Sequence, residues 1–153
     1  MEFTKKDLNK TLWVKRDNQE KNRKRYKVDA TGLTLWRLAV DIANKLTGKD
    51  KSYLSDFWDA WSYVIVENAW KFIVTWNNKL KQKKYYSYSG YKGNVKSITL
   101  DELIKKDPCK ALWYAVRGML PKNKLRDSRM KRLKLVVDTT TKSDNKVSFP
   151  FWK

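Results

Sequence analysis

The chain has 153 residues, of which 35 are Lys or Arg and 16 are Asp or Glu, so its formal charge is +19. This length suits one domain, and the charge favours a polyanionic partner, either nucleic acid or an anionic membrane surface, over a neutral substrate. There is no histidine and one cysteine, Cys109, which removes most catalytic triads and transition-metal sites and excludes an internal disulfide.

Membrane insertion and acid/base catalysis also find little support. The longest aliphatic runs have three residues, as at Val64–Val66, far short of the roughly 20 residues of a spanning helix, and the N-terminus lacks the apolar core of a signal peptide. We therefore expect a soluble, unsecreted protein.

Asp56 with Asp59, or Asp101 with Glu102, could form a carboxylate pair, but acidic residues are common near helix starts and loops. We expect no catalytic activity, metal or cofactor.

Positive charge is concentrated in the second half of the chain. Residues 1–30 carry ten basic and five acidic residues, residues 31–76 carry five of each, and residues 77–153 carry twenty and six. The net charges are therefore +5, 0 and +14. A neutral apolar middle followed by a basic half predicts a folded scaffold that carries a charged contact surface.

The first predicted elements are a strand and a helix. Tyr26–Ala30 has the pattern of a short strand. A helix is expected from a cap near Thr34 to a stop at Gly48, because apolar residues recur at helical spacing between them. These residues are Leu35, Leu38, Ala39, Ile42 and Leu46.

Two β-branched runs follow, Ser62–Glu67 and Lys71–Thr75. With the preceding strand and helix they predict a β-α-β unit with a further strand, and hence a parallel sheet with helices.

Capping residues and prolines predict helices in the second half of the chain. Thr99 and Glu102 match a capping box, Asp107–Pro108 places a cap before a proline, and Asn123 is a candidate cap for a helix over Lys124–Lys134. Pro121 separates the last two helices. The first of these has an apolar face suited to docking on the sheet, made of Ala111, Leu112, Ala115, Val116 and Met119.

Residues 115–135 form the first candidate contact surface. They include eight Lys or Arg and one acidic residue, Asp127, whereas a solvated helix face usually mixes both signs. A polyanion relieves this repulsion and releases counterions on binding. A merely solubilising face is the alternative. The candidate residues are Arg117, Lys122, Lys124, Arg129, Lys131, Arg132 and Lys134.

The second candidate surface, residues 77–94, mixes lysines with tyrosines. Ammonium groups suit phosphates, and phenol rings can stack on unpaired bases. Alternatively, Tyr alternating with Ser is typical of an edge strand with one packed face. The candidate residues are Lys79, Lys81, Lys83, Lys84, Tyr88 and Lys92.

Four strings of the sequence are distinctive in content and order. The most specific is Ala115-Val116-Arg117-Gly118-Met119-Leu120-Pro121-Lys122-Asn123, followed by its basic segment. Earlier in the chain come Val28-Asp29-Ala30-Thr31-Gly32, Tyr63-Val64-Ile65-Val66 with Asn68-Ala69, and Tyr85-Tyr86 with Ser89-Gly90-Tyr91. In this order, from about residue 26 to 135, they resemble the L13 family of large-subunit ribosomal proteins.

This resemblance implies a three-layer α/β/α domain around a small parallel sheet, with basic helical and loop extensions. It implies a basic N-terminal extension over 1–25, the L13-like domain over 26–136 and an unmatched tail over 137–153. The implied function is a non-catalytic constituent of the large subunit that binds its ribosomal RNA, beside neighbouring ribosomal proteins, and joins early in assembly. Arg37 is a further implied RNA contact.

Two alternatives remain open: a free-standing RNA-binding regulator or chaperone on the same domain, and a nucleic-acid enzyme that uses carboxylates and a metal. The expected location is a cytoplasmic ribosome, with an organellar ribosome as the other possibility. We expect no membrane and no small-molecule substrate as partner.

The chain departs from the family at several glycines. Trp36, Trp61 and Trp76 stand where members typically carry glycine, as does Arg126. Trp for Gly changes both side-chain volume and the permitted backbone angles, so local geometry at these positions is expected to differ.

Overall fold

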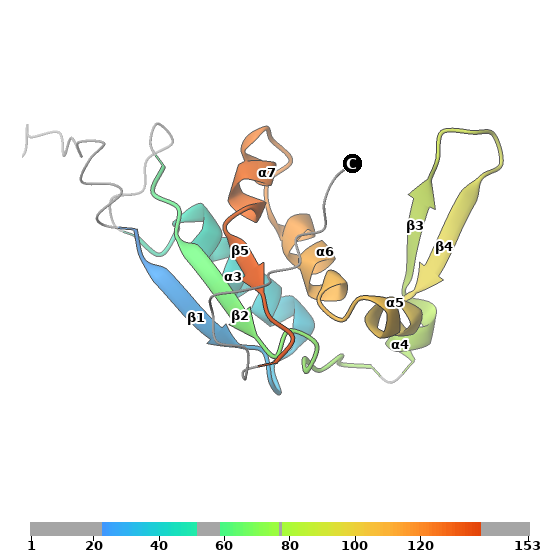
Figure 1. Ribbon diagram of the computed structural model, residues 1–153, viewed down its shortest axis with the longest axis horizontal. Coiled ribbons are helices and arrows are strands. Elements are labelled where there is room, and N and C mark those ends of the chain that lie inside the picture. The colour runs from blue at the N-terminus through green and yellow to red at the C-terminus, as the bar shows by residue number, and fades with distance from the viewer. Residues whose placement is uncertain (1–22, 52–58, 77, 139–153) are drawn as a thin grey trace, which may run out of the picture.

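The computed structural model describes residues 23–51, 59–76 and 78–138. A parallel sheet lies at one end and an antiparallel hairpin projects at the other, with helices between them (Figure 1). This arrangement confirms the prediction of an α/β domain around a small parallel sheet.

The sheet has the order β1-β2-β5, with β1 at Arg25–Asp29, β2 at Tyr63–Glu67 and β5 at Leu133–Leu135. Both pairings are parallel, and the register places Val28 opposite Val66 and Val64 opposite Leu133. Because side chains alternate along a strand, Val64, Val66 and Leu133 share one buried face. The helices cover this face.

Helix α3, Leu35–Thr47, is the main element packed on that face, as predicted. Leu38, Ile42 and Leu46 are buried in the same cluster as the strand valines. Thr34 is its N-cap and Gly48 its C-cap, the latter in the left-handed conformation that ends a helix without a Cβ penalty.

Helix α6, Lys110–Met119, packs against α3 rather than directly on the sheet. Leu112 and Val116 are buried in the main cluster. Met119 is 47% exposed, so it does not belong to the buried face on which the sequence pattern placed it: it lies in the last turn of α6, next to Leu120, whose side chain is buried instead.

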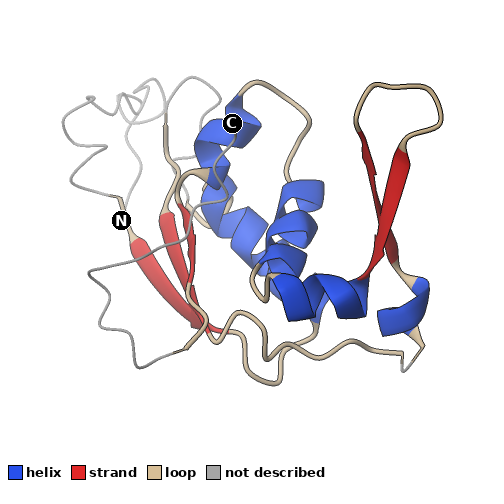
Figure 2. Cartoon of the chain, turned by 45° about the vertical axis from the view of Figure 1, so that its right-hand side comes forward, coloured by secondary structure: helices blue, strands red, loops and turns tan. Residues whose placement is uncertain are grey.

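The hairpin end is a second packing unit. It contains α4 (Lys79–Gln82), β3 (Lys84–Tyr88), β4 (Val95–Thr99) and α5 (Leu100–Lys106). A cluster of Phe72, Leu100, Leu103 and Ala111 joins its base to α6. The predicted capping box is present: the Glu102 N–H donates to the Thr99 hydroxyl and the Thr99 N–H to the Glu102 carboxylate. Figure 2 shows the hairpin standing clear of the helices.

The predicted strand over Lys71–Thr75 is wrong. Ile73 makes a single parallel bridge with Thr34: its N–H donates to the Leu33 carbonyl at 2.8 Å, and its carbonyl accepts from the Leu35 N–H at 3.1 Å. The pairing cannot continue because α3 begins at Leu35 and uses its backbone groups internally.

Two helix boundaries also differ from the predictions. Helix α6 begins at Lys110 with Cys109 as its N-cap, and Asp107 ends α5 instead of capping α6. Helix α7 covers Leu125–Met130 only. The chain then turns into β5, where pairing with β2 buries Leu133, so Lys134 lies on a strand rather than on the predicted helix.

Gly48→Ala should destabilise the domain by more than about 2 kcal/mol. The glycine has φ +79°, and an added Cβ would meet the Ala60 carbonyl oxygen at 2.8 Å; the left-handed angle alone costs roughly 1–2 kcal/mol. Gly32→Ala is the matched control, because its φ is +74° with nothing within 4 Å. Urea unfolding of both variants measures the difference, and equal losses would contradict a steric role for Gly48.

Candidate nucleic-acid interface

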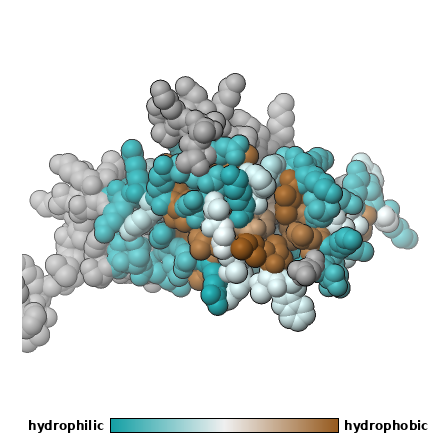
Figure 3. Space-filling view, turned by 90° about the horizontal axis from the view of Figure 1, so that it is seen from below, coloured by the Kyte–Doolittle hydropathy of each residue, from teal (hydrophilic) through white to brown (hydrophobic). Residues whose placement is uncertain are grey.

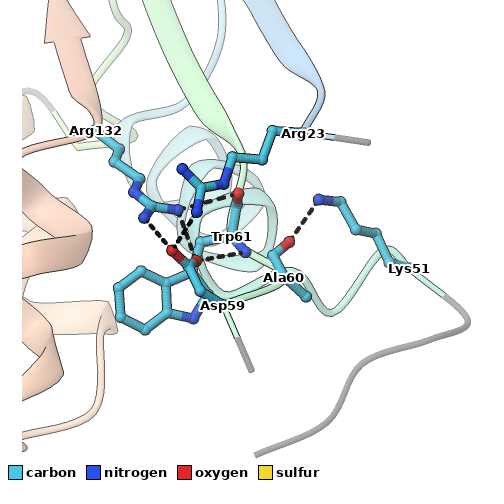
Figure 4. A network of polar contacts seen from close by, with 6 residues as sticks. All are labelled: Arg23, Lys51, Asp59, Ala60, Trp61 and Arg132. Carbon is cyan, nitrogen blue, oxygen red and sulfur yellow. Dashed lines mark hydrogen bonds and ion pairs between the residues drawn. The ribbon is translucent and has the colours of Figure 1, made fainter. Parts of the chain in front are cut away.

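Asp59, which lies shortly before β2, bonds two arginines that are distant from it in the sequence (Figure 4). Arg23 lies before β1, and Arg132 lies directly before β5. The Arg132 guanidinium donates to both oxygens of its carboxylate, to Oδ1 at 2.7 Å, and Arg23 donates to Oδ2 at 2.9 Å. The backbone N–H of Trp61 donates to Oδ1 at 3.2 Å. Burial alone would raise the pKa of Asp59, but the hydrogen bonds and charge of Arg132 outweigh it, and the pKa is lowered.

Trp61 packs against Arg132 and against a further arginine, Arg129. Its ring centroid lies 4.8 Å from Cζ of Arg129 and 4.9 Å from Cζ of Arg132, and the residue is 9% exposed. Contacts of this kind between a guanidinium and an indole face are favourable. Two of the predicted RNA-contact residues therefore also help to hold α7 and β5 against the start of β2.

Three residues that shape this region were not predicted as part of a site from the sequence. Asp59 was considered only as half of a carboxylate pair. Lys51 is buried, donates its ammonium to the Ala60 carbonyl, and has a pKa lowered by that burial. Arg126 donates to the Leu120 and Pro121 carbonyls, so it orders the loop after α6. No sequence signal distinguishes Lys51 and Arg126 from solvent-exposed cations.

The first predicted surface contains three partly buried arginines and four exposed lysines. Arg129 and Arg132 contact Trp61, and Arg117 lies with Cζ 5.2 Å from the Trp113 ring centroid. The exposed lysines are carried by the loop after α6, by the end of α7 and by β5. They are Lys122, Lys124, Lys131 and Lys134.

The second predicted surface lies on α4 and the hairpin. Its lysines are all exposed, and Tyr88 is 62% exposed. Its members are Lys79, Lys81, Lys83, Lys84, Lys92 and Tyr88. Lys96 on β4 is exposed as well and extends the set. Arg37 belongs to neither group, since it lies on α3 with Cζ 5.7 Å from the Trp36 ring centroid.

Parts of the two surfaces project to the same side of the molecule. The loop before α7 and the tip of the hairpin both point upward in Figures 1 and 2, whereas α4, which carries Lys79 and Lys81, lies at the base of the hairpin. The face seen from below is different: hydrophobic residues gather in its middle between hydrophilic ones (Figure 3).

Within residues 23–51, 59–76 and 78–138, no group of three or more Cys, Asp or Glu side chains is placed to hold a metal ion. None of the helices in these ranges is long and apolar enough to cross a bilayer.

The family model "Ribosomal protein L13" matches residues 23–142. The chain belongs to this family. The large ribosomal subunit protein uL13 of Tolumonas auensis is 47% identical over 114 residues, covering 74% of this chain and 80% of that protein. The protein of the same name from Thermotoga petrophila is 44% identical over 128 residues, 84% of each chain. The resemblance inferred from the sequence is thus confirmed.

The three tryptophans that the family resemblance predicts to stand at glycine positions differ in their surroundings. Trp36 and Trp76 are 55% and 73% exposed, whereas Trp61 is 9% exposed. Within the described residues, Asn68 is the one residue other than glycine with a positive φ. None of the three tryptophans therefore adopts a left-handed conformation.

Asp59→Ala should lower the free energy of unfolding by about 2 kcal/mol, because it leaves the partly buried Arg132 without its counter-charge. Asp59 has a lowered pKa, so its contribution is present above the ordinary aspartate pKa of about 3.9 and is lost as the pH falls below it. Urea unfolding between pH 7 and pH 2 measures both effects.

Asp101→Ala is the matched control for Asp59. Asp101 pairs with Lys105 at 2.7 Å on an exposed helix surface, where such a pair contributes about 0.5 kcal/mol or less. Equal losses for the two variants at pH 7 would show that the Asp59 network is no more important than a surface pair.

Trp61→Gly should destabilise the domain by roughly 3–5 kcal/mol, since it empties a packed site. Trp36→Gly and Trp76→Gly remove exposed indoles and should each cost about 1 kcal/mol or less. Thermal melts of the three single variants separate these cases. A Trp61→Gly variant as stable as the parent would mean that this position retains the tolerance of a family glycine.

Proposed function

We propose that the chain is a structural constituent of the large ribosomal subunit that binds large-subunit ribosomal RNA and supports early subunit assembly. The observation that carries the proposal is the set of exposed lysines in residues 122–134 of an L13-family domain, the segment that the Asp59–Arg132 ion pair ties to the residues before β2. The matched relatives are named large ribosomal subunit proteins, which is consistent with that role.

The proposed contacts are mainly to phosphate and sugar, because exposed ammonium groups neutralise the backbone without reading base edges. They comprise the first surface, the second surface and Arg37. Arg132 and Arg129 remain proposed RNA contacts, but their main role is structural: Arg132 bonds Asp59 and Arg129 packs on Trp61. Neighbouring large-subunit proteins are the other proposed partners, and the cytoplasmic ribosome is the proposed location.

Sedimentation tests the proposal against a free-standing RNA regulator on the same domain. A subunit constituent should co-migrate with salt-washed large subunits and be scarce in the free pool. A regulator should remain mostly in the free pool and in small complexes. Magnesium-dependent cleavage of RNA by the purified protein would instead favour a nuclease.

Replacing Lys122, Lys124, Lys131 and Lys134 together with Gln should weaken binding to a large-subunit ribosomal RNA transcript and flatten its salt dependence. Each lost phosphate contact lowers the slope of log K against log salt by about 0.7–0.9. The fold should be retained, because all four side chains are exposed. Filter binding from 50 to 300 mM KCl, with circular dichroism as the folding check, measures this.

The matched control replaces Lys27, Lys49, Lys105 and Lys106 with Gln. These lysines are also exposed but lie on β1, after α3 and on α5. The change in net charge is the same, so a general loss of attraction would affect both variants equally. Equal slopes for the two quadruple variants would contradict a specific role for the first surface.

A further inference from the structure

The β3–β4 hairpin has one packed face and one open face. Tyr85 and its cross-strand partner Ile98 turn toward the second hydrophobic cluster, where Tyr85 stacks on Tyr114 with ring centroids 5.3 Å apart. Because side chains alternate along a strand, Tyr86 and Tyr88 turn the other way. The hairpin therefore presents these two rings outward.

The open face is strongly exposed. Tyr86 is 71% exposed and Tyr88 is 62% exposed, and Val95, which pairs with Tyr88, is 59% exposed. Single exposed apolar residues are normal on proteins, but adjacent ones on a projecting ribbon usually mark a contact surface. A two-stranded hairpin is also only marginally stable alone, so a partner on this face would add to its order.

The spacing of the two rings fits a nucleic-acid base. Residues two apart on a strand are separated by roughly 6.8 Å, and a stacked base occupies about 3.4 Å. One flat base therefore fits between two tyrosine rings that turn parallel to each other. Stacking of this kind is available to any unpaired base, whatever its sequence.

The charge of the segment favours RNA over a protein as the occupant. Residues 68–100 contain seven lysines and no acidic residue. Lys84 lies on the same face as Tyr86 and Tyr88, and Lys83, Lys92 and Lys96 surround the ribbon. Ammonium groups around exposed rings provide for the phosphates on either side of a stacked base.

We propose that Tyr86 and Tyr88 hold one unpaired base of the bound RNA between their rings, while Lys84 contacts the adjoining phosphate. This inference rests on the proposed function and adds to it a base-stacking site beside the phosphate contacts. The hairpin then serves to capture a single-stranded loop or bulge, whereas the first surface contacts the RNA backbone.

The test uses the full chain and a large-subunit ribosomal RNA transcript. Tyr86→Leu with Tyr88→Leu should lower affinity by about 5- to 150-fold, the range for loss of one stacked base, with an unchanged salt slope. Tyr86→Phe with Tyr88→Phe keeps the rings and should bind within about twofold of the parent. Trp70→Leu is the control: this tryptophan is 41% exposed but lies outside both predicted surfaces, and its loss should leave affinity unchanged.

Ultraviolet crosslinking of the parent protein provides a measurement that does not depend on the folding of any variant. A nucleotide attached to Tyr86 or Tyr88 is the expected result. Parental affinity in the Leu variant, equal losses in the Phe and Leu variants, or no crosslink on residues 84–88 would each overturn the inference. So would a Leu variant that binds RNA normally but is lost from large subunits, because that outcome assigns the face to a protein.

The proposed function fails in a different way. If the parent protein binds the transcript weakly and with no salt dependence, the domain is not an RNA-binding constituent at all. If the parent binds with a steep salt dependence and the Leu variant does the same, only the base-stacking site is wrong.

Discussion

The ion pair between Asp59 and Arg132 fixes the position of the most basic part of the chain. Arg132 precedes β5 by one residue and follows α7, so its bond to a residue just before β2 holds both elements against the sheet. Without that bond, repulsion among the neighbouring lysines would favour an open segment. A single partly buried carboxylate thus lets a chain of formal charge +19 keep a compact basic face.

The molecule separates the residues that fold it from those that remain available for a partner. Asp59, Trp61 and Arg126 engage cations or carbonyls inside the structure. The exposed lysines have no comparable packing role, and their mutual repulsion is relieved when a polyanion binds and releases its counterions. RNA, the partner proposed above, would stabilise the folded state by binding to it in preference to the unfolded chain.

Local patterns predicted much of the fold. The strand at β1, the helix α3 with its glycine stop, and the capping box at Thr99 depend on nearest neighbours and on period, and they are confirmed. The predictions of a strand over Lys71–Thr75 and of a helix over Lys124–Lys134 were wrong because tertiary pairing decides both segments. The first segment makes one bridge before the segment that it pairs with enters α3, and the end of the second segment pairs with β2 as a strand.

The candidate contact residues were identifiable as charged, but their division into structural and exposed cations was not. Arg132 and Lys122 look alike in sequence, yet the first is bonded to Asp59 and the second is exposed. That difference depends on Asp59, which lies 73 residues from Arg132. Eight tryptophans against five glycines is likewise an unusual balance for a small domain, and the structure buries Trp61 while leaving Trp36 and Trp76 exposed.

RNA crosslinking in cells, followed by sequencing of the attached fragments and mapping of the attached peptides, tests the central claim most directly. The account predicts fragments concentrated in a few segments of large-subunit ribosomal RNA, joined to peptides from residues 79–96 and 117–134. Fragments spread over unrelated cellular RNAs, or attachment mainly through β1 and α5, would contradict it.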